Sequence, residues 1–312
     1  MGSTFSNGLR EIIHTAKTNL EVISVCFQNN VGMRYQHGQG VEPDMAEALL
    51  WFQKAAAQNF PSAQYQLGLL YDGGSGVAQD QQEALAWFRK AADQGHARAQ
   101  FDLGLRYAGG QGLPQDLRLA ATYFVRAADQ HYVPAQFMLG QLFDDSDSPL
   151  YHPAEALAWY RRAAEQGHSQ AQFALGLRYD CGQGVARDYA AALSCYQSAA
   201  QQGHVRAQFN LGLIYASGHG AARDLGQAHA WLSNAEQGGM PGATKYLKQT
   251  VARMDAVQLA SIGLAAAPEP EALAAALTTD SPALSVVPPA PRPKFSELLQ
   301  CKSNVPPQFD PL

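Results

Sequence analysis

Residues 63–71 read AQYQLGLLY, and residues 99–107, which lie 36 positions further on, read AQFDLGLRY. The same frame recurs along the chain, and its central glycine keeps this spacing at Gly32, Gly68, Gly104, Gly140, Gly176 and Gly212. A fixed period of roughly 20 to 50 residues marks a repeat array in which each unit is one supersecondary element. The period therefore predicts a stack of similar units.

Each unit contains two apolar stretches with helical spacing, separated by a glycine-rich break. In the second unit the stretches are residues 63–71 and 84–92, and the break at 73–77 reads GGSGV. Glycine ends a helix readily because it adopts positive φ at little steric cost. The pattern predicts one helix hairpin per unit.

An aspartate precedes the second stretch of five units, and in two of them a glutamate follows three residues later, as in a capping box. We predict that these carboxylates cap helices and are not catalytic acids. The second helices are expected to end in left-handed glycines at Gly95, Gly167 and Gly203. The capping aspartates are Asp44, Asp80, Asp116, Asp188 and Asp224.

One slot of the second stretch is aromatic in most units, and we interpret this column as core. It holds Trp51, Trp87, Tyr123, Trp159 and Trp231, with Cys195 as the exception. A hairpin of this size cannot bury its apolar face alone, so neighbouring units must stack. The expected fold is all-α: an α/α superhelical solenoid of about six 36-residue helix-turn-helix repeats, with capping helices at both ends.

Four regions are expected: an N-terminal segment with a capping helix (1–26), six repeats (27–242), C-terminal capping helices (243–267) and a disordered tail rich in proline and alanine (268–312). Within the tail, Phe295, Leu298 and Leu299 have the spacing of a short docking helix, for a partner or for the protein's own groove. An uncommitted tail is the alternative.

The frame A-x-x-x-L-G-x-x-Y-x-x-G-x-G-V-x-x-D-x-x-x-A-x-x-W-x-x-x-A-A-x-x-G-H is almost complete from Ala63 to His96. It resembles the Sel-one-like repeat (SLR) family, relatives of the tetratricopeptide repeats, over about residues 27–264. The resemblance implies a non-enzymatic scaffold or adaptor that binds a protein partner, in signalling, quality control, secretion or bacterial envelope assembly. It implies no cofactor.

Two slots of the first helix vary while their neighbours stay constant, and they share one helix face because they are four residues apart. By analogy with tetratricopeptide arrays, this face is expected to line a concave groove for an extended or helical peptide of some acidic character. Simple tolerance of a solvent-facing position is the alternative. Reversing the charges of Arg106 and Arg178 is expected to weaken partner capture without melting the fold. The predicted groove residues are Gln66, Leu70, Asp102, Arg106, Met138, Leu142, Ala174, Arg178, Asn210 and Ile214.

The fourth unit departs from the frame. Its loop at Asp144–Pro153 replaces the glycines with acids and prolines, and His152 stands where the capping aspartate would be. The preceding Gly-His is replaced by His131-Tyr132. We hypothesise a specialised joint or binding edge here. A metal site in this loop is conceivable, but a solvated loop is the preferred interpretation.

Composition excludes several functions. A net charge of −5 gives no footprint for nucleic acid, and no apolar run approaches the length of about 20 residues that spans a membrane. The four cysteines do not recur with the repeat, which favours reduced thiols and a cytoplasmic location; no secretory signal is expected. No metal site is expected, because the recurring His96, His168 and His204 are interpreted as structural.

Two alternatives to the scaffold remain open, and the oligomeric state is open as well. One is the β-lactam-binding or hydrolase activity suggested for cysteine-rich relatives, although the chain has no Ser-x-x-Lys. The other is a structural factor that self-assembles through its ends.

Overall fold

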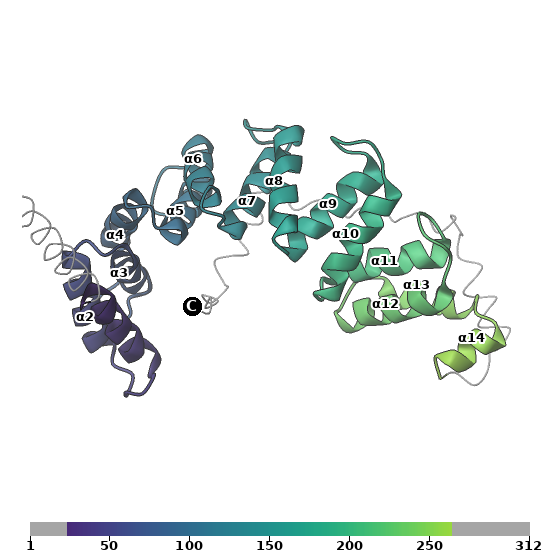
Figure 1. The fold of residues 1–312 in the computed structure, drawn as a ribbon, viewed down its shortest axis with the longest axis horizontal. Coiled ribbons are helices and arrows are strands. Elements are labelled where there is room, and N and C mark those ends of the chain that lie inside the picture. Colours follow the sequence, from purple (N-terminus) through teal and green to yellow (C-terminus); the bar gives the residue numbers. More distant parts are fainter. Residues whose placement is uncertain (1–23, 264–312) are drawn as a thin grey trace, which may run out of the picture. The chain divides into compact units, whose positions relative to one another are not determined.

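The structure is a computed structural model that describes residues 24–263. All regular elements in this part of the chain are helices, which confirms the predicted all-α solenoid class (Figure 1). The described residues fall into two compact units, 24–135 and 136–263. Two predicted features lie outside the described residues: most of the N-terminal capping helix, and the tail with Phe295, Leu298 and Leu299.

In the first unit each helix packs against the next one in the chain. Residues 24–37 are helical and supply the first helix of the first hairpin. The elements that follow are α2 (Met45–Ala57), α3 (Pro61–Gly73), α4 (Gln81–Asp93), α5 (Ala97–Gly109) and α6 (Leu117–Ala128).

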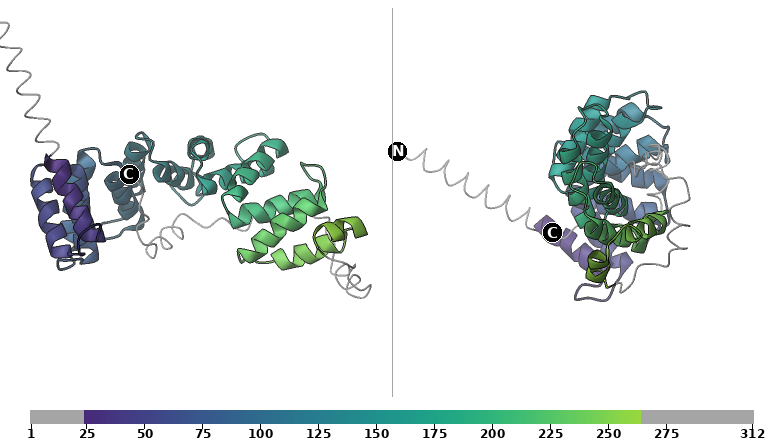
Figure 2. Two further views of the ribbon diagram at one scale, coloured as in Figure 1. Left: turned by 60° about the horizontal axis from the view of Figure 1, so that its bottom comes forward. Right: turned by 90° about the vertical axis from the view of Figure 1, so that its right-hand side faces the viewer.

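The second unit continues the same alternation of first and second helices, and the boundary between the units falls near the start of α7. Two helices follow the sixth hairpin: α13 packs on α12, as can be followed in Figure 2, and α14 also touches α12. The elements are α7 (Val133–Asp144), α8 (Pro153–Glu165), α9 (Ser169–Cys181), α10 (Tyr189–Gln201), α11 (Val205–Ser217), α12 (Leu225–Gln237), α13 (Ala243–Val251) and α14 (Ala256–Ser261).

The predicted turn and cap residues act as expected. Gly74 ends α3 with φ of 65°, and its N–H donates to the carbonyl of Leu70. Asp80 begins α4 by accepting hydrogen bonds from the backbone N–H groups of Gln82 and Glu83. All five predicted aspartates cap helices in this way. The reciprocal bond of a full capping box is formed elsewhere, in α14, between Asp255 and Gln258.

The repeat glycine is a contact point between the two helices of its own hairpin. A Cβ added to Gly68 in α3 would lie 2.6 Å from ring carbons of Phe88 in α4. Real Cβ atoms do not approach so closely, so the ring can lie against α3 only because residue 68 has no side chain. The same arrangement joins Gly32 to Phe52, Gly104 to Phe124, Gly140 to Tyr160, Gly176 to Tyr196, and Gly212 to Leu232.

The prediction that the aromatic column forms the core is confirmed at Trp159, which is buried, whereas the other members of the column are only partly buried at the edge of the core. The fully buried ring is Phe88, whereas Trp87 is only half-buried. Consecutive helical residues point about 100° apart, so the two rings cannot share one environment. The Trp87 ring instead carries the Lys90 ammonium 3.8 Å from its centroid. Equivalent cations lie over Trp51, Tyr123 and Trp159.

Candidate functional site

The predicted groove residues lie on one face of the first helices, but this face is much less open than expected. Gln66, Asp102, Arg106 and Ala174 are partly exposed. The other six predicted residues are buried: Leu70, Met138, Leu142, Arg178, Asn210 and Ile214. Their burial contradicts, for these six residues, the alternative that they vary because they face solvent, whereas partner binding by this face remains a prediction.

In the first unit, polar members of this face join consecutive first helices. The Arg106 guanidinium in α5 pairs with the Asp72 carboxylate at the end of α3 at 2.6 Å, and it lies 5.0 Å from the centroid of the Phe88 ring. One turn earlier, the Tyr65 hydroxyl donates to Asp102 at 2.7 Å. Burial, followed by the charge of Asp102, raises the pKa of Tyr65. These side chains therefore hold neighbouring repeats together.

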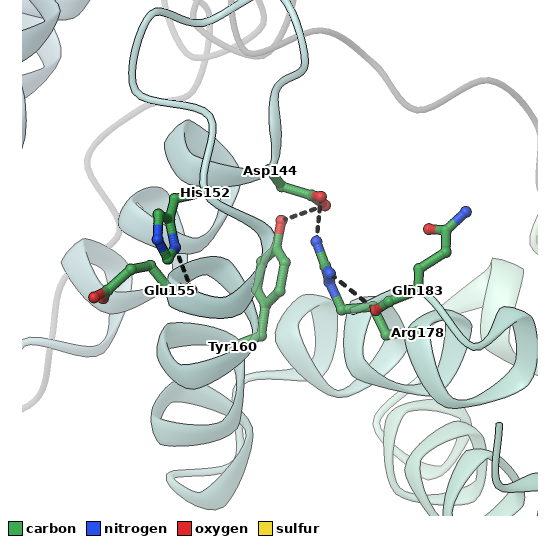
Figure 3. Close-up of polar contacts among 6 residues, drawn as sticks. All are labelled: Asp144, His152, Glu155, Tyr160, Arg178 and Gln183. Atoms are coloured by element: carbon green, nitrogen blue, oxygen red, sulfur yellow. Dashed lines mark hydrogen bonds and ion pairs between the residues drawn. The ribbon is translucent and has the colours of Figure 1, made fainter. Parts of the chain in front are cut away.

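In the second unit the same type of pair is buried. Figure 3 shows the Arg178 guanidinium of α9 paired with the Asp144 carboxylate at the end of α7. Arg178 also donates from Nη1 to the carbonyl of Gln183 at 3.3 Å, and the Tyr160 hydroxyl of α8 donates to Asp144 at 3.4 Å. Only 1% of the Arg178 side chain is exposed, so its charge is balanced inside the protein by Asp144, while its Nε has no hydrogen-bond partner among the described residues. This arrangement corrects the prediction that Arg178 can be reversed without melting the fold.

The loop from Asp144 to Pro153 is tied to the helices at both of its ends, while most of the residues between them are exposed, in agreement with the preferred interpretation of a solvated loop. Asp144 is held by Arg178 as described. At the other end His152 caps α8, its Nδ1 accepting from the N–H of Glu155 at 3.2 Å, and Pro153 takes the first helical position. The predicted cap position of His152 is confirmed.

Asp180 occupies the same repeat position as Asp72 and Asp144. It is buried at the end of α9 and accepts a hydrogen bond from the Tyr196 hydroxyl at 3.3 Å. Burial raises the pKa of Asp180, while that hydrogen bond and the charges of Arg187 and His219 oppose the rise. The position that supplies the arginine to Asp72 and Asp144 holds Ile214 here.

A glutamine ladder between helices was missed by the sequence reasoning. Gln94 at the end of α4 donates to the Oε1 atom of Gln64 in α3 at 2.6 Å, and Gln100 in α5 donates to the carbonyl of Ala92 in α4 at 3.0 Å. The usable signal was glutamine recurring 30 residues apart in successive units. The ladder pairs are Gln28–Gln58, Gln64–Gln94, Gln100–Gln130, Gln136–Gln166 and Gln172–Gln202.

The recurring histidines are helix caps, which agrees with their structural interpretation. In His96, His168 and His204, Nδ1 accepts a hydrogen bond from a backbone N–H three residues later at 3.2 Å. The His96 ring also stacks on Tyr65, 4.8 Å between centroids. Burial, helped by the charge of Arg98, lowers the pKa of His96 to about 4. Burial lowers the pKa of His204 too.

These caps predict that acid destabilises the array. The unfolded chain binds a proton at His96 near pH 6.5, whereas the folded chain does so only near pH 4. The contribution of His96 to the free energy of unfolding is therefore complete above pH 6.5 and falls as the pH drops toward 4. The total loss is up to about 3 kcal/mol, and below pH 4 the contribution changes no further. His204 acts in the same direction. Urea midpoints measured at pH 7.5, 6 and 4.5 should record the loss.

The control is a double variant, His96→Asn with His204→Asn, because asparagine caps a helix without titrating in this range. Its stability should depend less on pH than that of the wild type. Equal pH dependence in the two proteins would contradict the assignment of the effect to the caps.

The described part of the chain holds no group of three or more His, Cys, Asp or Glu side chains placed to bind a metal ion. None of its helices has the length and apolar character needed to cross a membrane.

Comparison with known proteins agrees with the repeat geometry. The family model described as "Sel1 repeat" matches residues 27–60, 61–96, 97–132, 133–168, 169–204 and 205–240. No curated protein matches the chain.

Two solved structures are similar along most of the chain. The first is c5321, a protective antigen of uropathogenic Escherichia coli strains displaying an SLR fold: it is 31% identical, with a TM-score of 0.72, and the match covers 81% of this chain and 52% of c5321. The second is a Sel1 repeat protein from Oxalobacter formigenes, which is 35% identical with a TM-score of 0.62. The match covers 69% of this chain and 88% of the Oxalobacter protein. The chain thus spans about half the length of c5321.

Proposed function

Because the chain belongs to the Sel1 repeat family, whose members are generally protein-interaction scaffolds, we propose that it is a non-enzymatic adaptor that holds a segment of a partner protein against its first helices. One observation carries the proposal. The caps, turns and glycine–ring contacts recur from repeat to repeat, whereas the side chains on one face of the first helices differ. Recognition of a particular partner requires positions that the fold leaves free to differ.

The chemistry of this face favours a partner different from the acidic peptide expected from sequence. The guanidinium groups of Arg106 and Arg178 are already paired with aspartates of the preceding repeat. The partly exposed polar side chains beside them in the first unit are Gln66, Asp72 and Asp102. Asp72 and Asp102 are themselves bonded to Arg106 and Tyr65, but the face of the first unit carries two carboxylates to one guanidinium, and this negative balance suits a segment that offers hydrogen-bond donors and positive charge.

The proposal includes a cytoplasmic location. Its support is that Cys26, Cys181 and Cys195 form no disulfide with one another within the described residues, as is usual in a reducing compartment.

The test is quantitative affinity capture with the full chain as bait. Two variants place a lysine on the first-helix face, Gln66→Lys and Ala174→Lys. Two matched controls place a lysine on an exposed position of the second helix in the same hairpins, Gln82→Lys and Ala190→Lys. The first pair should reduce recovery of specific partners at least tenfold, and the control pair should not. Equal recovery with all four would exclude this face.

The two alternatives have their own readouts. Acylation by a labelled penicillin, or substrate turnover, would replace the scaffold with the hydrolase class. Light scattering that shows a mass rising with protein concentration would instead favour the self-assembling factor.

A further inference from the structure

Aspartate–arginine pairs join consecutive first helices at two places in the array. Asp72 pairs with Arg106, and Asp144 pairs with Arg178; in both pairs the arginine follows 34 residues after the aspartate. Each guanidinium also lies over the ring that packs on its hairpin's glycine: Arg106 is 5.0 Å from the Phe88 centroid, and Arg178 is 5.3 Å from that of Tyr160. Carboxylate and ring together form a repeated guanidinium-binding arrangement.

The fifth repeat keeps the receiving half of this arrangement without the arginine. Asp180 occupies the position of Asp72 and Asp144, and Tyr196 occupies that of Phe88 and Tyr160. The position 34 residues after Asp180 holds Ile214, which has no charge to offer. Within residues 24–263, Asp180 makes no ion pair.

The surroundings of Asp180 compensate its charge only in part. The residue is 7% exposed, and among the described side chains Tyr196 donates a hydrogen bond to it. Arg187 and His219 act on it through their charges from exposed positions, and Arg206 lies over Phe173 instead of Tyr196. A buried carboxylate without a paired cation is energetically costly, because its charge has lost water without gaining a counter-charge. An alanine, as at positions 108 and 216, would avoid this cost.

We propose that Asp180 is the receptor for an arginine side chain of the partner segment, which takes the place that Arg106 and Arg178 take in the complete pairs. This inference rests on the proposed function and specifies its partner chemistry. Arginine fits better than lysine because the chain itself uses a guanidinium at both complete pairs, and a planar guanidinium can bond a carboxylate through two N–H groups.

The first test is direct binding of a small probe, observed by NMR. The chain contains only five isoleucines, so the methyl signal of Ile214, identified by its loss in Ile214→Val, reports the site in the full-length protein. N-acetyl-arginine amide should shift this signal saturably in the millimolar range. The citrulline analogue has the same shape without the charge and should leave the signal unchanged. Equal shifts with both probes, or none with arginine, would overturn the proposal.

Two variants locate the effect. Asp180→Asn removes the charge but keeps an acceptor for Tyr196, and it should abolish the arginine-dependent shift. Asp188→Asn is the matched control: it neutralises an exposed carboxylate in the same hairpin and keeps a residue that caps α10. This control should bind the probe as the wild type does. Loss of binding in both variants would indicate nonspecific attraction and contradict the proposal.

A third variant, Ile214→Arg, supplies the missing guanidinium from the chain itself. It should raise the melting temperature by several degrees, abolish probe binding and reduce partner capture at least tenfold. If the wild type captures no specific partner but still binds the probe through Asp180, the proposed function fails and the arginine site stands. If the probe binds only after Arg292→Ala and Lys294→Ala are introduced, the chain's own tail occupies Asp180, and the assignment to a partner is overturned.

Discussion

Replacing Arg178 by leucine should lower the free energy of unfolding by about 3–5 kcal/mol. The substitution leaves the largely buried Asp144 carboxylate with the Tyr160 hydroxyl, at 3.4 Å, and without its cation. Removing one partner of a buried ion pair costs more than the pair itself contributes, because the remaining charge has lost both water and counter-charge. Urea denaturation, together with hydrogen exchange of the α7–α9 amides, should record the loss.

The chain suggests its own compensating variant. At the corresponding positions of the third and fourth repeats it has Ala108 and Leu142 instead of an aspartate and an arginine. The double variant Asp144→Ala with Arg178→Leu should therefore lie within about 1 kcal/mol of the wild type, since an apolar pair can replace a buried ion pair at little cost. If the double variant is as unstable as Arg178→Leu alone, the cost comes from lost packing over the Tyr160 ring and not from the unpaired charge.

The hairpin could be predicted from sequence because its signals act locally. Gly74, Asp80 and Gly95 each determine the backbone or the cap within one turn of their own position. Because the same signals recur in six repeats, a prediction made for one hairpin applies to all of them. Trp87 and Phe88 could not be told apart because both positions are aromatic or bulky in most repeats, so composition alone did not reveal which of them faces the glycine.

The candidate site was harder to predict because its side chains are paired across repeats. Variation at the slots of Asp102 and Arg106 suggested exposure to solvent. Both residues instead bond side chains of the preceding repeat, Tyr65 and Asp72, which lie more than 30 residues away in the sequence. A single sequence shows the variation but not the pairing. The glutamine ladder was missed for the same reason.

The second large effect is expected at the repeat glycine. Gly104→Val should destabilise the first unit by about 3 kcal/mol, because even a Cβ at this position would lie 2.6 Å from the Phe124 ring. The Phe124 ring is fully buried, and its centroid lies 5.7 Å from that of the Phe101 ring, so it has little space into which it can move. Thermal and urea unfolding of the full chain, with hydrogen exchange of α5 and α6, measure the effect.

Gly109→Val in the same helix is the matched control. A Cβ there would meet only the Gln111 side chain, at 3.5 Å, which is an ordinary contact on an exposed residue. The control should change stability by less than about 0.5 kcal/mol. Similar losses at both positions would mean that the cost comes from valine in a helix rather than from the ring.

A double-mutant cycle with Phe124 separates steric conflict from helix propensity. Phe124→Ala alone should cost about 3–5 kcal/mol, since it empties a buried ring site. Once the ring is gone, the valine side chain introduced by Gly104→Val no longer meets it and fills part of the space, so the combined cost should fall short of the sum by about 1 kcal/mol or more. Additive costs would show that the glycine is required for helix geometry. A favourable coupling would show that the 36-residue period is maintained by the contact between a glycine and the ring of its own hairpin.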